Sequence, residues 1–166
     1  MVGTRSCPCG VNPCLIMEKP LNYHQSTEKV GTSGQPSKEQ LTDIAQMGYE
    51  VVVNLAMHDS DNALPDEGGI VTGLGMSYFH IPVPFEKPTA DHLKTFCGIM
   101  SVLEEKKVWV HCAVNARVSA FMFHYLTRVR GVSERDATSP FLKDWRPLMD
   151  EAWKSFMILG KADLGL

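Results

Sequence analysis

The chain has 166 residues, of which 44% are hydrophobic, and its formal net charge at pH 7 is -3. This length and apolar content suffice for one well-buried core, so we expect a single domain. Lys and Arg residues are scattered, which leaves no basic patch for a nucleic-acid backbone, and no apolar run approaches the roughly 20 residues of a membrane-spanning helix. We therefore expect a cytoplasmic protein that binds neither nucleic acid nor membrane; the oligomeric state is left open.

Three of the five cysteines, Cys7, Cys9 and Cys14, lie close together near the start of the chain. An odd count with this spacing is not a disulfide framework. The three could form a metal clip, but no fourth Cys or His lies at a zinc-like spacing, so we favour a disordered leader. The predicted organisation is a leader at 1–20, a domain at 21–160 and a tail at 161–166, with no metal and no other cofactor.

The first predicted elements of the domain are a helix and a buried strand. Ser37 and Gln40 form a capping box and Gly48 provides a stop, which together predict a helix from Lys38 to Met47. The segment 49–56 contains three consecutive valines, a pattern typical of a strand that is buried on both faces.

The middle of the chain predicts two more helices and a second strand. A polar loop at 58–67 leads into a short helix at 67–74, and 77–83 follows as a strand. After an irregular stretch rich in proline, Thr89 caps a helix with an apolar stripe, which includes Leu93, Phe96, Cys97, Met100 and Leu103.

The last third of the chain predicts a third strand followed by helices. The strand is 107–111, with Val108 and Val110 facing one side and Trp109 the other. The helix at 118–129 is apolar on most sides and should be the central buried helix, and Gly131 ends it. Ser133 caps a short helical turn, and a final helical region at 142–159 is interrupted by Pro147, with Trp145, Trp153 and Phe156 as core anchors. Strands that alternate with helices predict an α/β fold with a small, mainly parallel central sheet flanked by helices.

The loop between the third strand and the central helix carries the residues with catalytic chemistry. In such sheets, ligands bind where a strand end leads into a helix N-terminus, whose free N-H groups and dipole attract an anion. A thiol at this place is stabilised as a thiolate, which makes Cys112 the expected nucleophile. Arg117 can fork onto two phosphoryl oxygens, and His111 can orient the loop through backbone hydrogen bonds. The expected phosphate-binding residues are Ala113, Val114, Asn115, Ala116 and Arg117.

Val110, His111, Cys112 and Arg117, set between an apolar strand and an apolar helix, resemble the signature of the protein tyrosine and dual-specificity phosphatase superfamily. More closely, the chain is similar to a bacterial branch, the β-lactamase-hydrolase-like phosphatase family. The segments that carry this likeness are 32–36, 53–55, 80–83 and 111–121, and the likeness extends over roughly residues 21 to 156.

The resemblance implies a three-layer phosphatase-like fold and the hydrolysis of phosphate monoesters without a metal. Cys112 would take the phosphoryl group as phosphocysteine, Arg117 would hold it, and water would release it. The implied partner is a phosphorylated protein or a small phosphate ester.

The loop departs from the superfamily pattern in three ways. Four residues rather than five separate Cys112 from Arg117, so the ring loses one inward N-H, and we expect weak activity. Asn115 stands near the place of the usual glycine, and Asn accepts the left-handed conformation more readily than most residues. The hydroxyl residue that usually follows the arginine is displaced to Ser119, which is expected to support the loop but to assist the departure of the thiolate less.

The general acid of the family is a loop aspartate, and no residue matches it unambiguously. Glu86, which follows the second strand, is the preferred candidate. Asp91 is better explained as a residue that compensates a helix dipole. The acidic residues of the loop after the first strand could approach the same rim; of these, Asp66 and Glu67 rank below Glu86.

Two other functions use the same residues. A rhodanese-like sulfurtransferase would carry a persulfide on Cys112, and rhodanese-like loops have the shorter length seen here. A non-catalytic anion-binding pseudophosphatase would keep the loop and lack an efficient acid.

Overall fold

The computed structural model describes residues 18–166, so most of the expected leader at 1–20 lies outside the described residues. The core of the fold is a five-stranded sheet in the order β1-β2-β5-β3-β4. β1 pairs antiparallel with β2, and every other pairing is parallel. The strands are β1 (His24–Gln25), β2 (Val30–Ser33), β3 (Val51–Asn54), β4 (Ser77–His80) and β5 (Val108–His111).

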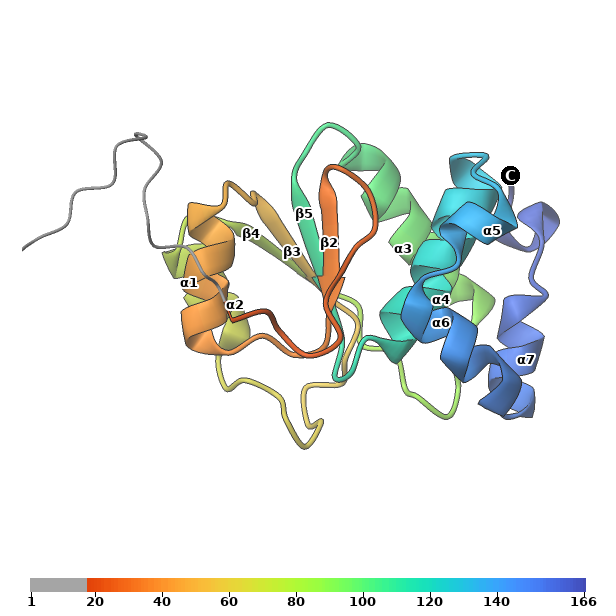
Figure 1. Cartoon of the computed structure of the whole chain (residues 1–166), viewed down its shortest axis with the longest axis horizontal. Coiled ribbons are helices and arrows are strands. Elements are labelled where there is room, and N and C mark those ends of the chain that lie inside the picture. Colours follow the sequence, from red (N-terminus) through yellow and green to blue (C-terminus); the bar gives the residue numbers. More distant parts are fainter. Residues whose placement is uncertain (1–17) are drawn as a thin grey trace, which may run out of the picture.

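Helices cover both faces of the sheet, which gives the three layers of an α/β fold (Figure 1). On one side lie α1 (Lys38–Gln46) and α2 (Glu67–Gly73). On the other side lie α3 (Ala90–Val102), α4 (Ala116–His124) with a π-helical turn (Tyr125–Val129), α5 (Glu134–Ala137), α6 (Pro140–Trp145) and α7 (Glu151–Met157). Short 3-10 turns occupy Arg146–Leu148 and Lys161–Leu164. The predicted fold class is confirmed.

The first two strands of the sheet were not predicted from the sequence. β2 reads Val-Gly-Thr-Ser, which has neither an apolar run nor alternation, although all four residues are buried. Its glycine is required by packing, because a Cβ at Gly31 would lie 2.8 Å from the Trp109 ring. A prediction of three strands was therefore wrong, since small residues in β2 make room for a large neighbour on β5.

Helix ends follow the local sequence signals. Ser37 and Gln40 form the predicted capping box of α1, and Thr89 caps α3. Ser133 caps α5, as expected. Gly48 follows the end of α1 with a φ of 86°, a left-handed conformation that favours glycine.

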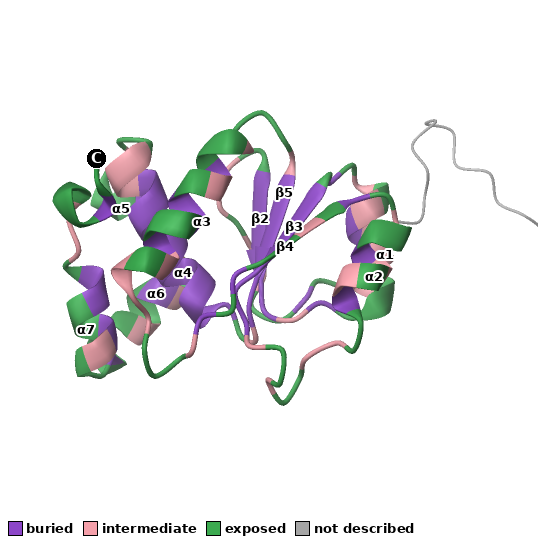
Figure 2. Ribbon diagram, turned by 180° about the vertical axis from the view of Figure 1, so that it is seen from behind, coloured by how far each residue is buried: buried purple, intermediate pink, exposed green. Residues whose placement is uncertain are grey.

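The sheet separates two apolar clusters, and this division places the site. Val108 and Val110 of β5 face the larger cluster with α3 and α4, whereas Trp109 faces the smaller cluster with α1 and α2. Every residue of α4 is buried, as predicted for the central helix (Figure 2). Because side chains alternate along a strand, His111 continues on the α1 and α2 side and Cys112 on the α3 and α4 side.

The C-terminal segment packs onto the domain, with Leu164 buried in the larger cluster. Among the helices at 18–166, none is long and apolar enough to cross a membrane.

Candidate active site

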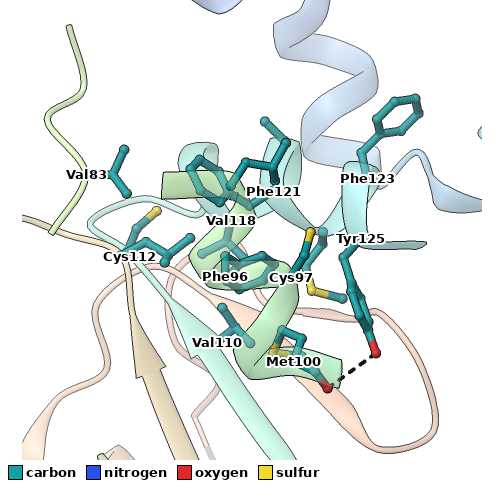
Figure 3. Close-up of a cluster of buried hydrophobic side chains, with 14 of the residues drawn as sticks. Val83, Phe96, Cys97, Met100, Val110, Cys112, Val118, Phe121, Phe123 and Tyr125 are labelled. Atoms are coloured by element: carbon teal, nitrogen blue, oxygen red, sulfur yellow. Dashed lines mark hydrogen bonds between the residues drawn. The ribbon is translucent and has the colours of Figure 1, made fainter. Parts of the chain in front are cut away.

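The loop of interest joins the end of β5 to the start of α4. Cys112 directly follows β5, and Arg117 lies in the first turn of α4. Cys112 has no exposed surface and belongs to the larger apolar cluster. Figure 3 shows its sulfur at the margin of this cluster, near Val83 and Val118. The thiol therefore lies at the base of the loop, beneath residues that reach the surface, such as Val114, which is 40% exposed.

The loop is shaped by one left-handed residue and by close contact with the turn after β2. Asn115, which precedes α4, has φ 73° and ψ 6°. Gly34 forms a bridge with Val114, and the Gln35 N-H donates to the Ala113 carbonyl at 3.0 Å. A Cβ at Gly34 would lie 2.7 Å from that carbonyl oxygen, so glycine permits the close approach.

Two asparagines outside the loop also hold its backbone. Asn22, before β1, donates from Nδ2 to the Val114 carbonyl at 2.9 Å, and its own carbonyl accepts from Asn115 Nδ2 at 2.8 Å. Asn62, in the segment before α2, donates to the Ala113 carbonyl at 2.9 Å. Hydrogen bonds to its carbonyl oxygens thus hold the loop in place, and its N-H groups remain available to bind a ligand.

Several of those N-H groups have no acceptor in the part of the chain that the structure describes. The backbone N-H groups of Ala113, Val114 and Ala116 donate to no residue there. The first N-H groups of any helix also lack an intrahelical acceptor, and the helix dipole adds positive potential at the same place. This arrangement can bind an anion.

Arg117 is buried at the same place, with 6% of its surface exposed. Its Nη1 donates to the Val83 carbonyl at 2.8 Å, and its guanidinium carbon lies 5.7 Å from the centre of the Phe85 ring. Its Nε is buried and has no partner among residues 18–166. A buried donor without an acceptor is costly, and an oxyanion bound in the loop would supply one.

His111 connects the loop to a carboxylate on the other side of the sheet. Its Nδ1 lies 3.2 Å from the Cys112 carbonyl oxygen, and its Nε2 lies 3.0 Å from Glu67 Oε2. Asn54 donates to the same Glu67 oxygen at 3.1 Å, and Gln35 donates to the other oxygen. His111 is thus held at both ring nitrogens.

Burial raises the pKa of Glu67, but the hydrogen bond and charge of His111, together with hydrogen bonds from Gln35 and Tyr78, outweigh it. The net pKa of Glu67 is below its ordinary value, so the carboxylate is ionised near neutral pH. Glu67 is the first residue of α2, where the sequence predicted a helix to begin, but it is only 5% exposed and hydrogen-bonds to His111, whereas it had been a low-ranked candidate for the general acid at the rim.

The other predicted residues lie as follows. Glu86 is exposed, one residue beyond Phe85, and has no hydrogen-bond partner among residues 18–166. Ser119 donates its hydroxyl to the Ala116 carbonyl at 2.7 Å and so closes the first turn of α4. Asp91 lies in the first turn of α3, and Asp66 precedes α2 and is exposed. Over 18–166, no cluster of three or more His, Cys, Asp or Glu side chains could hold a metal ion.

Several residues that support the loop were missed in the sequence. Asn54 was noted only for its likeness to the family, yet it pairs in register with His111 on the neighbouring strand, a signal that the parallel sheet could have supplied. Asn22 offered no such signal, because it lies 92 residues from Val114 in the chain.

The chain is similar to known phosphatase domains in sequence and fold. Residues 17–152 match the model of a family described as DSP-PTPase phosphatase fused to NAD+ kinase. The crystal structure of a candidate phosphatase (DUF442) from Shewanella putrefaciens CN-32 is 31% identical, with a TM-score of 0.76 over 83% of this chain and 87% of that one. None of the curated proteins matches the chain in sequence.

Two more distant structures share the fold. PTPMT1 in complex with PI(5)P is 15% identical, with a TM-score of 0.65 over 86% of this chain and 94% of that one. TpbA of P. aeruginosa in complex with pTyr is 14% identical, with a TM-score of 0.58 over 70% of this chain and 69% of that one. Because the family model covers most of the domain, the chain belongs to the DSP-PTPase family of phosphatase domains described as fused to NAD+ kinase, within the protein tyrosine and dual-specificity phosphatase superfamily.

Proposed function

We propose that the chain hydrolyses phosphate monoesters through a phosphocysteine on Cys112. The observation that carries this proposal is the buried Arg117, whose Nε has no partner in the described chain, beside a loop whose N-H groups are also unused. Such donors suit the equatorial oxygens of a phosphoryl group in transfer. Cys112, buried at the start of the same loop, is the proposed nucleophile.

In the first step, the Cys112 thiolate attacks phosphorus, the bond from phosphorus to the ester oxygen breaks, and the leaving oxygen takes a proton. In the second step, water attacks the phosphocysteine, the sulfur-phosphorus bond breaks, and inorganic phosphate leaves with the thiolate restored. Arg117 and the loop N-H groups hold the phosphoryl oxygens in both steps. Four residues between Cys112 and Arg117 give one inward N-H fewer than the superfamily loop, so we expect slow turnover.

We assign the leaving-group proton to Glu86, because its segment adjoins Arg117 through the Val83 carbonyl and the Phe85 ring. General acid catalysis contributes about 10²- to 10⁴-fold and matters most for a poor leaving group. Glu86→Gln should therefore slow hydrolysis of an alkyl phosphate far more than that of p-nitrophenyl phosphate. Equal effects on both substrates, measured as kcat/KM, would remove Glu86 from this role.

The proposed substrates are a phosphorylated protein or a small phosphate ester. TpbA and PTPMT1, which share the fold, were solved with pTyr and PI(5)P, and both ligands carry a phosphate ester. They support this chemical class and do not discriminate within it.

The test is hydrolysis of p-nitrophenyl phosphate, run beside sulfur transfer from thiosulfate to cyanide, with Cys112→Ser as the control. Phosphate release that is lost in Cys112→Ser supports the proposal. Sulfur transfer without phosphate release would favour the rhodanese-like alternative, for which the short loop is the supporting observation. A thiol protected by phosphate, with neither activity, would favour a non-catalytic anion-binding role, which the complete burial of Cys112 supports.

A further inference from the structure

Glu67 is a buried carboxylate whose partners all approach as donors. Asn54 and Gln35 donate amide N-H groups to it, one to each oxygen, and His111 Nε2 lies 3.0 Å from Oε2. A carboxylate that accepts this many hydrogen bonds at 5% exposure is ionised, and an ionised carboxylate can only accept. The nitrogen that faces it must therefore carry a proton.

The second ring nitrogen of His111 meets the same constraint. Nδ1 lies 3.2 Å from the Cys112 carbonyl oxygen, and a backbone carbonyl also accepts only. A neutral imidazole has one N-H, so it could satisfy one of these two acceptors and would set a lone pair against the other. The imidazolium has two N-H groups and satisfies both.

We propose that Glu67 is a positioning residue that holds His111 as an imidazolium, with Nδ1-H on the Cys112 carbonyl and a positive charge directly behind the catalytic cysteine. The inference rests on the proposed function, because it gives Glu67 a role in that cysteine chemistry. Glu67 does not touch substrate; it acts through His111, from α2 on the opposite side of the sheet from Arg117.

The other side chains that hydrogen-bond to Glu67 carry no charge. From β4, Tyr78 faces Glu67, and burial keeps the pKa of Tyr78 well above its ordinary value, so it stays neutral. Asn54 of β3 and Gln35 after β2 carry no charge. Cys112 directly follows His111 after β5, with its side chain on the α3 and α4 side of the sheet. The charge of His111 is therefore balanced by Glu67 and by the Cys112 thiolate when that forms.

The direct test is the protonation of His111 in the folded protein at pH 7, read from ¹⁵N NMR of histidine-labelled chain and assigned with His111→Gln. In the wild-type chain, both ring nitrogens of His111 should give the protonated signal. In Glu67→Gln, which keeps the shape and removes the charge, one of them should become unprotonated. Glu67→Asp should restore the wild-type signal at least in part. A neutral His111 in the wild-type chain would overturn the proposal, whatever the variants do.

The functional arm measures how fast iodoacetamide alkylates Cys112 at pH 7, by mass spectrometry of the peptide that carries it. That readout excludes Cys7, Cys9 and Cys14. We expect Glu67→Gln to slow alkylation about tenfold and to move the acidic limb of the kcat/KM profile to higher pH, as loss of a nearby charge predicts. The matched control is Glu104→Gln, which removes an exposed carboxylate 2.9 Å from Arg130 and should change neither.

The outcomes separate this inference from the proposed function. If folded Glu67→Gln keeps its phosphatase activity and shows the wild-type alkylation rate and pH profile, only the proposed role of Glu67 is contradicted. The expected NMR and alkylation results without phosphate release contradict the phosphatase proposal alone.

Discussion

Asn115 shows how one residue sets the curvature of the loop. Its φ of 73° is unfavourable for most side chains, and its Nδ2 also donates to the Asn22 carbonyl. Asn115→Gly should lose that hydrogen bond and keep the backbone, whereas Asn115→Ala should lose the bond and add backbone strain. We expect Asn115→Ala to be less stable than Asn115→Gly by about 1 kcal/mol in urea unfolding.

Equal stability of the two Asn115 variants would mean that the backbone conformation there is not left-handed. The comparison is matched, because both substitutions remove the same amide.

At the residue scale, the sequence predicted the residues next to one another in the chain and missed those that meet through the fold. Cys112 and Arg117 are five positions apart, and their roles could be proposed from the strand, the loop and the helix around them. Glu67 lies 44 positions from His111, and only packing of α2 against the sheet joins the two. Its burial and its hydrogen bonds make it an ionised hydrogen-bond acceptor rather than the low-ranked general-acid candidate of the sequence analysis.

At the scale of elements, β2 and the loop are coupled through Gly34. A Cβ at Gly34 would lie 2.7 Å from the Ala113 carbonyl and 3.1 Å from the Val114 Cα, both of which are backbone atoms. Gly34→Ala should therefore push the loop away from β2, with a stability loss of about 1–3 kcal/mol and weaker phosphate protection of the Cys112 thiol. Thermal unfolding and alkylation in the presence of phosphate measure the two effects.

The control for that experiment is Gly73→Ala, at the end of α2, where a Cβ would meet no atom within 4 Å. If both variants behaved like the wild-type chain, the close contact between Gly34 and the loop would not exist in solution.

The helices and the strands β3, β4 and β5 were predicted because their signals are local. Capping residues, apolar stripes and the run of valines in β3 all depend on neighbours within a few positions. β1 and β2 carry no such signal, because β1 has two residues and β2 is selected by the ring of Trp109 rather than by its own apolarity. Tertiary packing overrides local preference in these two strands.

At the scale of the whole molecule, the buried Glu67 makes stability depend on pH. Its pKa in the folded chain is below the value of 4.5 for the free side chain. A lowered folded pKa means that the stability from ionised Glu67 is complete above pH 4.5 and is lost as pH falls through the folded value. The free energy of unfolding of the wild type should exceed that of Glu67→Gln by about 3 kcal/mol near neutral pH, and this difference should shrink in acid.

Urea unfolding of the two chains over a pH series measures this difference, in which the titrations of groups other than Glu67 and its partner His111 cancel. A difference that stays constant from neutral pH into acid would show that Glu67 is not ionised in the folded state.

The central claim is that Cys112 carries the phosphoryl group, and trapping the intermediate tests it most directly. The protein would be mixed with p-nitrophenyl phosphate, quenched within the first turnover and digested for mass spectrometry. We predict one added phosphoryl group on the peptide that contains Cys112, absent in Cys112→Ser. Sustained phosphate release in the wild-type chain with no adduct on Cys112, or with activity preserved in Cys112→Ser, would contradict the account.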